Sequence, residues 1–376
     1  MTLAAGVITR VTLTAFRTYT SLTWRPSPGV SILTGPNGSG KTNVLEAVSL
    51  LVPGRGLRQA RLAELAQHGS TAGWGVAAQL GPELALATGA MPDGPADRRV
   101  FRVNGAAPRN QAEVAAALAA LWLVPQMDRL FQDGASGRRR FLDRLVYALQ
   151  PGHAREVSAY ETALASRNRL LAQGADAAWL AATEDSMARH AVAATAARMA
   201  VIGQLNLVAP GVFPAARLAL LDPLADQLAR APALATEDWL RAAWAGSRGR
   251  DAAAGQTALG AHRADVTLAD AATGRPAAEA STGQQKALLI GIILAQAGLI
   301  TAARGHPPLV LLDEPAVHLD AHRRDALWAA LTATGAQIML TGTDRDIFAP
   351  LRGVAAGWMT GDGVLRPDGW FGTGAS

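Results

Sequence analysis

The sequence contains no cysteine and only two lysines, Lys41 and Lys286, among its 35 lysine and arginine residues. The absence of cysteine excludes disulfides, thiolate zinc sites and cysteine nucleophiles, and it fits a reducing compartment. Arginine therefore supplies almost all of the positive charge, and the formal net charge is +5. Such a basic chain can contact nucleic acid phosphates, although a composition rich in alanine, glycine and arginine is equally typical of a GC-rich genome.

Long hydrophobic runs are lacking as well. The alanine-rich stretch 115–123 is short and weakly apolar, whereas a helix that spans a bilayer needs about 20 apolar residues. Near the N-terminus, Thr9, Arg10 and Thr12 interrupt what would be the apolar part of a signal peptide. Since 49% of the 376 residues are hydrophobic, the chain can still bury a sizeable core. We expect a cytoplasmic protein that folds without a membrane.

Three segments differ in their hydrophobic pattern. Residues 1–125 contain short apolar or alternating runs, typical of strands, around one helical stretch. Residues 126–254 are dominated by helical spacing that prolines interrupt, and no heptad seam or internal repeat is present. From 255 to 376 strand and helix signals return. We predict an α/β domain formed by residues 1–125 and 255–376, with a mainly helical lobe, residues 126–254, inserted into it.

The most specific motif is a glycine-rich loop between a predicted strand and a predicted helix. It fits the pattern G-x-x-x-x-G-K-[ST] with Gly35, Pro36, Asn37, Gly38, Ser39, Gly40, Lys41 and Thr42, and Asn43 follows it. The glycines let backbone N–H groups curl around phosphates at the positive end of the next helix. Lys41 should reach the β- and γ-phosphates, and the Thr42 hydroxyl should bind Mg²⁺. We predict an ATP site with Mg²⁺ that includes all nine residues.

An apolar strand ending in two acids, residues 309–314, has the form of a Walker B element. Strand ends are often acidic simply because the chain emerges into solvent there, so this pattern alone is not specific. Together with the phosphate loop it indicates a nucleotide site. Asp313 would hold Mg²⁺, and Glu314 would polarise the attacking water as the catalytic base.

Residues 281–285, S-T-G-Q-Q, precede a long helical run and resemble the signature motif of ATP-binding-cassette ATPases. In those heads a serine hydroxyl, a glycine backbone and a helix N-terminus contact the γ-phosphate bound by a second subunit. The resemblance assigns Ser281, Gly283 and Gln284 to the nucleotide site, although Ser281 alone could be a plain helix cap. The segment His318-Leu319-Asp320 resembles the D-loop of such heads, which adds Asp320 to the site.

Two further positions carry a weaker signal. Gln126 lies where a Q-loop glutamine would sense Mg²⁺, but a lone glutamine is as often a solvated loop residue. Thr343 precedes Asp344 where cassette ATPases usually carry a switch histidine before an acid. We assign both residues to the nucleotide site and expect slow hydrolysis because the histidine is replaced.

Five segments together resemble the RecF family of bacterial recombination-repair proteins. They read L-T-A-F-R-T-Y at 13–19, K-T-N-V-L-E-A at 41–47, R-R-R-F-L-D at 138–143, a Y-to-L-L stretch at 160–171, and G-A-H-R-A-D at 260–265. The resemblance covers nearly the whole chain and implies an ATP-binding-cassette-type P-loop head with an inserted helical lobe II. Departures from the family pattern occur at Glu314, His318, Ala261 and Ala264. These departures affect details of hydrolysis and partner contact rather than the fold.

The resemblance also implies partners and a role. RecF-like proteins form ATP-dependent homodimers that clamp DNA at single-strand gaps, and with RecO and RecR they promote RecA loading. ATP hydrolysis would be weak, DNA-stimulated, and act as a switch. Candidate contacts to nucleotide or DNA are Arg17, Arg58, Arg138, Arg139 and Arg263, each as readily a solvated surface residue.

Two alternatives belong to other functional classes. A nucleotide-binding subunit of a membrane transporter would carry the signature Leu-Ser-Gly-Gly-Gln and a switch histidine. This sequence has neither: residues 281–285 read S-T-G-Q-Q, and Thr343 occupies the position of the histidine. A compact SMC-like or phage-defence ATPase also fits the motifs, although the short lobe without heptads argues against a true SMC protein.

Overall fold

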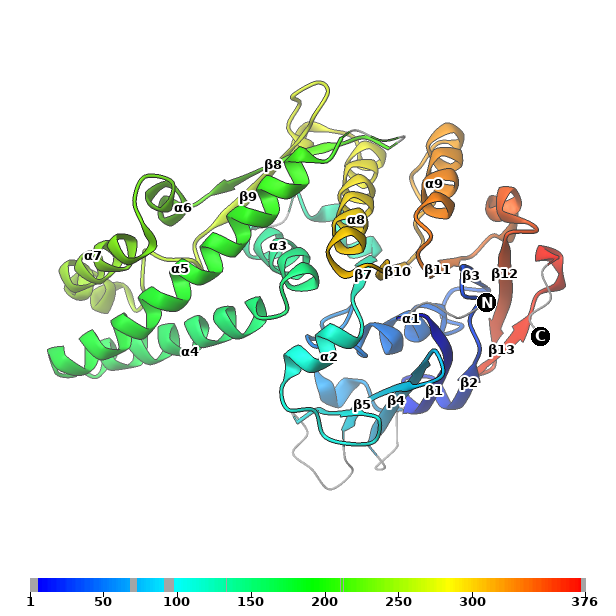
Figure 1. The fold of residues 1–376 in the computed structure, drawn as a ribbon, viewed down its shortest axis with the longest axis horizontal. Coiled ribbons are helices and arrows are strands. Elements are labelled where there is room, and N and C mark those ends of the chain that lie inside the picture. The colour runs from blue at the N-terminus through cyan, green and yellow to red at the C-terminus, as the bar shows by residue number, and fades with distance from the viewer. Residues whose placement is uncertain are drawn as a thin grey trace. The chain divides into compact units, whose positions relative to one another are not determined.

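The structure is a computed structural model that describes residues 6–67, 73–90, 98–132, 134–209, 211 and 213–372. The chain forms two compact units (Figure 1). The first unit contains residues 1–128, 210–214 and 281–376, and the second contains 129–209 and 215–280. Gln126 thus falls in the first unit, whereas the sequence pattern placed it at the start of the inserted lobe.

The first unit contains a mixed six-stranded sheet. Its strands, in spatial order, are β13 (Val364–Pro367), β12 (Ala355–Gly361), β3 (Val30–Thr34), β11 (Ile338–Gly342), β10 (Leu309–Leu312) and β7 (Ala120–Leu123). Every pair is parallel except β12 with β13. Strands β3, β7, β10 and β11 are buried along their whole length, which explains their continuous apolar runs. The phosphate loop and the Walker B acids follow two of these strands, β3 and β10.

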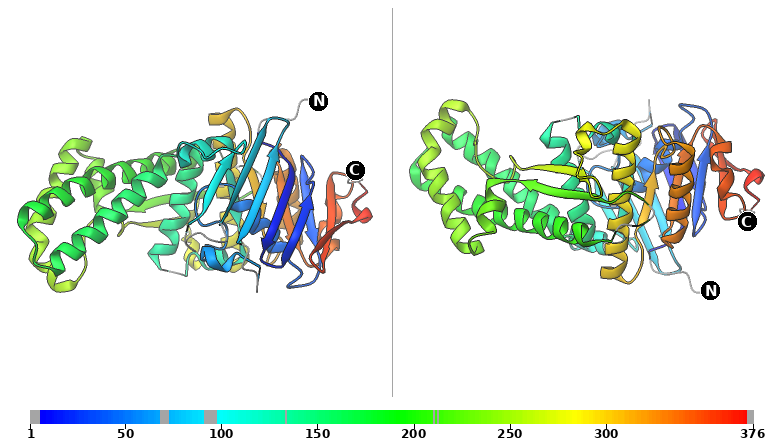
Figure 2. Two further views of the ribbon diagram at one scale, coloured as in Figure 1. Left: turned by 90° about the horizontal axis from the view of Figure 1, so that it is seen from below. Right: turned by 90° about the horizontal axis from the view of Figure 1, so that it is seen from above.

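A second sheet of the first unit is antiparallel. Its strands, in spatial order, are β2 (Tyr19–Trp24), β1 (Ile8–Phe16), β4 (Trp74–Leu80), β5 (Leu84–Ala90) and β6 (Val100–Val103). Buried and exposed residues alternate along β4, as expected for a sheet with one face on the core. Figure 2 shows these blue to cyan strands side by side.

The first unit also contains four α-helices within the described residues. They are α1 (Lys41–Ser49), α2 (Gln111–Ala117), α8 (Thr282–Arg304) and α9 (Ala321–Ala333), with short 3₁₀ turns η1 (Leu62–Glu64), η2 (Pro125–Arg129), which ends one residue past the unit, η4 (Arg345–Leu351) and η5 (Gly369–Phe371). Helix α1 contacts β1 and β4 of one sheet and β11 of the other. It is buried along most of its length, so the helix that follows the phosphate loop is fixed by both sheets.

Helix α8 is long and apolar enough to cross a membrane by length and composition alone, with a window of mean hydropathy 1.8. The expectation that the chain has no apolar stretch of this length is wrong for α8. The helix packs against β7 and α9, and 56% of the window is buried within the protein. We therefore interpret α8 as a core helix.

The second unit is mainly helical. Its elements are α3 (Ala135–Leu149), α4 (His153–Ala172), α5 (Ala177–Leu207), β8 (Ala216–Leu221), α6 (Pro223–Leu228), α7 (Ala233–Ala254), β9 (Asp265–Asp270) and the turn η3 (Ala277–Glu279). Strand β9 pairs antiparallel with β8. This pairing groups residues 255–280 with the helices, whereas the sequence pattern assigned them to the α/β domain.

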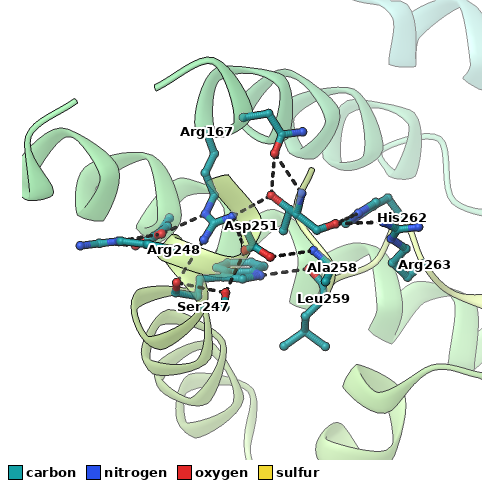
Figure 3. A network of polar contacts seen from close by, with 12 residues as sticks. Arg167, Ser247, Arg248, Asp251, Ala258, Leu259, His262 and Arg263 are labelled. Carbon is teal, nitrogen blue, oxygen red and sulfur yellow. Dashed lines mark hydrogen bonds and ion pairs between the residues drawn. The ribbon is translucent and has the colours of Figure 1, made fainter. Parts of the chain in front are cut away.

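A buried arginine joins the helices of the second unit. Arg167, on α4, is fully buried, and its Nε donates to Glu184 at 2.9 Å. Its Nη1 donates to Asp251 at 2.8 Å and to Thr257 at 2.7 Å, and its Nη2 donates to the Trp244 carbonyl at 3.0 Å. Figure 3 shows how Arg167 and Asp251 face each other between the helices. Both carboxylates are nearly inaccessible to water. Asp251 depends on this guanidinium for its neutralising charge, whereas Glu184 also pairs with Arg248.

We expect Arg167→Met to lower the free energy of unfolding by about 3–5 kcal/mol, because it leaves the Asp251 carboxylate buried without a countercharge. Arg248→Met is the matched control. It removes the second, partly exposed arginine on Glu184 and leaves Arg167 in place, so it should cost about 1 kcal/mol or less. Urea unfolding monitored by circular dichroism measures both variants, and an equal loss in the two would contradict this account.

Candidate nucleotide site

The phosphate loop has the backbone that its glycines allow. Gly35, Gly38 and Gly40 all have positive φ angles, between +80° and +144°. A Cβ atom at Gly35 would lie 2.6 Å from the Thr360 hydroxyl, and one at Gly40 would lie 2.6 Å from the Tyr19 hydroxyl. Larger residues would therefore displace the loop from both sheets.

Lys41 begins α1 and points back into the loop. Its side chain is only 5% exposed, and Nζ donates to the carbonyls of Gly35 at 2.7 Å and Pro36 at 2.8 Å. Burial lowers the pKa of Lys41, an effect that the nearby Glu314 and Asp313 oppose. The ammonium thus lies inside the curve of the loop, at the end of α1 where the backbone N–H groups favour an anion.

Asp313, at the end of β10, is joined to the loop and to the neighbouring strand. The Thr42 hydroxyl donates to its two carboxylate oxygens at 2.9 and 3.1 Å. The Thr341 hydroxyl, on β11, donates to Asp313 Oδ1 at 2.7 Å. The structure therefore brings together Thr42 and Asp313, two of the three predicted Mg²⁺ ligands.

Glu314 follows with φ of +48°, a conformation uncommon for a residue with a side chain. Its N–H donates to the Thr341 hydroxyl at 2.9 Å. Its carbonyl accepts from Lys286 Nζ at 3.1 Å, and the same ammonium lies 3.3 Å from Asp128. The Glu314 backbone is thus held from two sides, and its side chain is only half-buried.

The signature segment forms the start of α8. Ser281 caps the helix, since its hydroxyl accepts from the Gln284 N–H at 3.3 Å and its N–H donates to the Gln284 side chain at 3.0 Å. Ser281 and its neighbour Thr282 are exposed. A Cβ atom at Gly283 would collide with the His318 carbonyl, so the signature helix and the D-loop segment are in close contact.

The remaining predicted residues lie at the margin of these contacts. Asp320 caps α9, where its side chain accepts from the Arg323 N–H at 2.8 Å. Asn43 accepts from Arg58 at 2.8 Å and donates to Thr18 at 3.0 Å. Gln126, in η2, and Thr343, after β11, are exposed. Their assignment to the nucleotide site stays a prediction.

Sequence reasoning missed four contributors. Thr341, Asp128 and Thr360 contact the motif residues from strands or turns elsewhere in the chain, and no local pattern marks them. Tyr19 ends the segment 13–19, but its place beside Gly40 was not predicted. Lys286 did carry a signal, because it is one of two lysines in the sequence. Its side chain is 1% exposed, and its ammonium contacts Asp128 and the Glu314 carbonyl.

All five candidate arginines donate to protein oxygen atoms. Arg58 donates to the Asn43 amide oxygen and Arg139 to the Ala264 carbonyl, each at 2.8 Å. Arg17 makes a two-pronged contact with buried Glu46 at 2.9 and 2.8 Å, and Arg138 does the same with Asp265 at 2.8 Å. Arg263 donates to Gln256 and to the Thr257 carbonyl. These contacts give each of them a structural role.

The donor set at the Walker B end suits Mg²⁺. Among the described residues, no group of three or more His, Cys, Asp or Glu side chains gathers as a metal site. Mg²⁺ at a nucleotide usually needs only one or two carboxylates together with phosphate oxygens and water. Asp313 and the Thr42 hydroxyl, in contact with each other, match that requirement.

Comparisons with known proteins agree with this geometry. Residues 10–65 match the family model of an AAA domain. The chain is 43% identical over 370 residues to the DNA replication and repair protein RecF of Mesorhizobium japonicum, covering 96% of this chain and 97% of that one. It is 45% identical over 354 residues to the RecF protein of Allorhizobium ampelinum, with 92% and 94% covered.

Solved structures show the same fold. A structure of the recombination mediator protein RecF with ATP aligns with a TM-score of 0.81 at 20% identity, covering 96% of this chain and 99% of that one. The Smc head domain from Pyrococcus furiosus, bound to part of ScpA, aligns with a TM-score of 0.52 at 15% identity, with 96% and 95% covered. The predicted α/β fold of a P-loop head is confirmed. Since the identity to curated relatives exceeds 40% over nearly the full length, the chain belongs to the RecF family of DNA replication and repair proteins.

Proposed function

We propose that this RecF-family protein is an ATP-driven dimer that binds DNA and hydrolyses ATP slowly, as a switch. The observation that carries the proposal is the direct contact of Thr42, in the phosphate loop, with Asp313, at the Walker B end. Two motifs 271 positions apart thereby meet at one site. Membership of the RecF family excludes the transporter subunit as the alternative.

ATP would bind with its phosphates inside the loop 35–42. The N–H groups of the loop would donate to phosphate oxygens, and Lys41 Nζ would exchange the carbonyls of Gly35 and Pro36 for the β- and γ-phosphates. Mg²⁺, held by Thr42 and Asp313 and, as we propose, sensed by Gln126, would neutralise charge on those phosphates. The burial of Lys41 supports this role, because a desolvated ammonium gains most from an anionic ligand.

Glu314 is the proposed catalytic base. Its backbone is fixed at φ +48° by Thr341 and Lys286, so the direction of its side chain is set by the fold rather than by a flexible loop. From that position the carboxylate would orient a water molecule toward the γ-phosphate and accept its proton. Thr343, where a switch histidine is usual, cannot assist in this transfer, which supports slow turnover.

The second half of the site would come from another copy of the chain. Ser281 is exposed at the positive end of α8, a helix long enough to favour an anion there. We propose that Ser281, Gly283 and Gln284 of one copy, with Asp320, complete the nucleotide site of the other. ATP would then favour the closed dimer because it binds that state more tightly.

DNA would be held between the paired copies through its phosphates, with little sequence specificity, as the net charge of +5 permits. We further propose the family's setting: single-strand gaps, cooperation with RecO and RecR, RecA loading, and a cytoplasmic location. The head would correspond to the first unit, residues 1–128, 210–214 and 281–376, and lobe II to the second, residues 129–209 and 215–280. DNA stimulation of hydrolysis would follow, since DNA and ATP favour the same closed state.

We expect ATP to dimerise the protein and to tighten its binding to gapped DNA relative to ADP. Lys41→Ala should abolish both effects because it removes the ammonium from the loop, and Ser281→Arg should abolish them because it blocks the second half of the site. Analytical ultracentrifugation and DNA-binding anisotropy, each with ATP and with ADP, measure the two effects. Ala302→Arg, an exposed position at the other end of α8, is the matched control for Ser281→Arg. If the wild-type protein stays monomeric in the presence of ATP and DNA, the proposal is wrong.

We expect Glu314→Gln to retain ATP binding and to lower kcat about 10²–10⁴-fold, trapping an ATP-bound dimer. The substitution keeps the size of the side chain, and the contacts from Lys286 and to Thr341 involve only the backbone. Steady-state ATPase assays with a separate nucleotide-binding titration distinguish the two properties. Asp325→Asn, which removes an exposed carboxylate from the same unit, should leave both unchanged. Persisting turnover in Glu314→Gln would assign the base to another residue.

A further inference from the structure

Within the second unit, a small pocket of about 130 Å³ is lined by basic and polar side chains. Ser136, Arg139 and Arg140 enter it from α3, Tyr160 from α4, Arg198 from α5, and His262 from the segment before β9. These residues come from α3, α4 and α5 and from the segment 260–265. The proposed ATP chemistry uses none of them, so their convergence needs a separate explanation.

Three guanidinium groups surround the pocket, and the carboxylate among them is already neutralised. Asp143 accepts from Arg198 Nε at 2.8 Å and Nη2 at 2.9 Å, and from His153 at 2.8 Å. Glu161, the other acidic lining residue, is exposed at the rim. The positive charges of Arg139 and Arg140 therefore have no carboxylate of their own within the pocket.

Arg139 has the most unused hydrogen-bonding capacity. It is half-buried, and within the described part of the chain its one hydrogen bond is from Nη1 to the Ala264 carbonyl at 2.8 Å. Burial, followed by the proximity of the Arg198 guanidinium, lowers the pKa of Arg139. Its Nε and Nη2 groups remain as donors beside a second cation, a setting that favours an added anion.

The wall opposite these donors is rigid. The Tyr160 hydroxyl lies 2.6 Å from His262 Nδ1, and His262 Nε2 lies 3.0 Å from the Thr257 carbonyl. Burial lowers the pKa of His262, so the ring is neutral, accepts at Nδ1 and donates at Nε2. Thr257 in turn bonds to Arg167, which ties the pocket wall to the buried network of Figure 3. A Cβ atom at Gly260 would collide with the Tyr160 hydroxyl, so only glycine allows this packing.

We propose that this pocket binds a phosphate group. The free donors come from Arg139 and Arg140, both on α3, because Arg198 of α5 is engaged by Asp143 and the Ala261 carbonyl. Two adjacent guanidinium groups without a carboxylate of their own suit an oxyanion with several acceptor atoms, such as phosphate. The phosphate comes either from free inorganic phosphate or from a DNA backbone. The site lies wholly within the second unit, so it does not depend on the proposed ATP site.

Equilibrium dialysis of the full chain with radiolabelled inorganic phosphate, in saturating ADP to fill the phosphate loop, tests the pocket. Arg139→Gln and Arg140→Gln should each weaken phosphate binding about tenfold, the effect of losing one charged hydrogen bond. Arg155→Gln, an exposed arginine on α4 outside the pocket, should bind as the wild type does. Arg140 is exposed and makes no hydrogen bond within the described residues, so its replacement keeps the fold even if Arg139→Gln does not.

DNA-binding anisotropy with the same variants identifies the source of the phosphate. If DNA binding is about tenfold weaker in Arg139→Gln and Arg140→Gln but not in Arg155→Gln, and inorganic phosphate competes with DNA, the pocket binds a DNA phosphate. Unchanged DNA binding together with weakened phosphate uptake indicates free phosphate. Equal behaviour of Arg139→Gln, Arg140→Gln and Arg155→Gln in both measurements overturns the proposal. So does acetate that competes as well as phosphate, because it would indicate a carboxylate ligand.

Discussion

The buried carboxylate of Asp313 is the constraint on which the head depends. It accepts hydrogen bonds from Thr42 of the phosphate loop and from Thr341 of the neighbouring strand, so it joins three segments that are distant in the sequence. Those contacts are possible because β3, β11 and β10 are adjacent and parallel, which brings their carboxyl ends to one edge of the sheet. A nucleotide bound at that edge would meet the loop, the Asp313 carboxylate and the proposed catalytic base together.

Lys286 connects this edge to the signature helix. Its ammonium contacts both the Glu314 carbonyl and Asp128, while Gly283, less than one turn earlier on α8, packs against the D-loop carbonyl of His318. If a second copy displaced the start of α8, Lys286 would move and the backbone of Glu314 would shift with it. In this account, assembly of the dimer and orientation of the catalytic carboxylate are coupled by one buried charge, because few other arrangements satisfy an ammonium that is 1% exposed.

The sequence predicted the motifs whose function requires particular residues at a fixed spacing. The phosphate loop from Gly35 to Thr42 was evident because its glycines and lysine are needed at fixed spacing, and the apolar strand before Asp313 was evident from its composition. The partners Thr341 and Asp128 could not be predicted, because the order of strands decides which turns meet. The pairing of β8 with β9 and the burial of Arg167 were missed for the same reason: each depends on contacts between segments far apart in the chain.

We propose that each ATP site is built from two copies of the chain, and a mixture of two inactive variants can show this. A dimer of one Lys41→Ala copy and one Ser281→Arg copy has one intact composite site, with Lys41 from the second copy and Ser281 from the first. We expect the mixture to regain ATP-dependent dimerisation and part of the ATPase activity, although neither variant has either property alone. A mixture that stays as inactive as its two components would show that Lys41 and Ser281 act within the same copy, or that Ser281 has no part in the site.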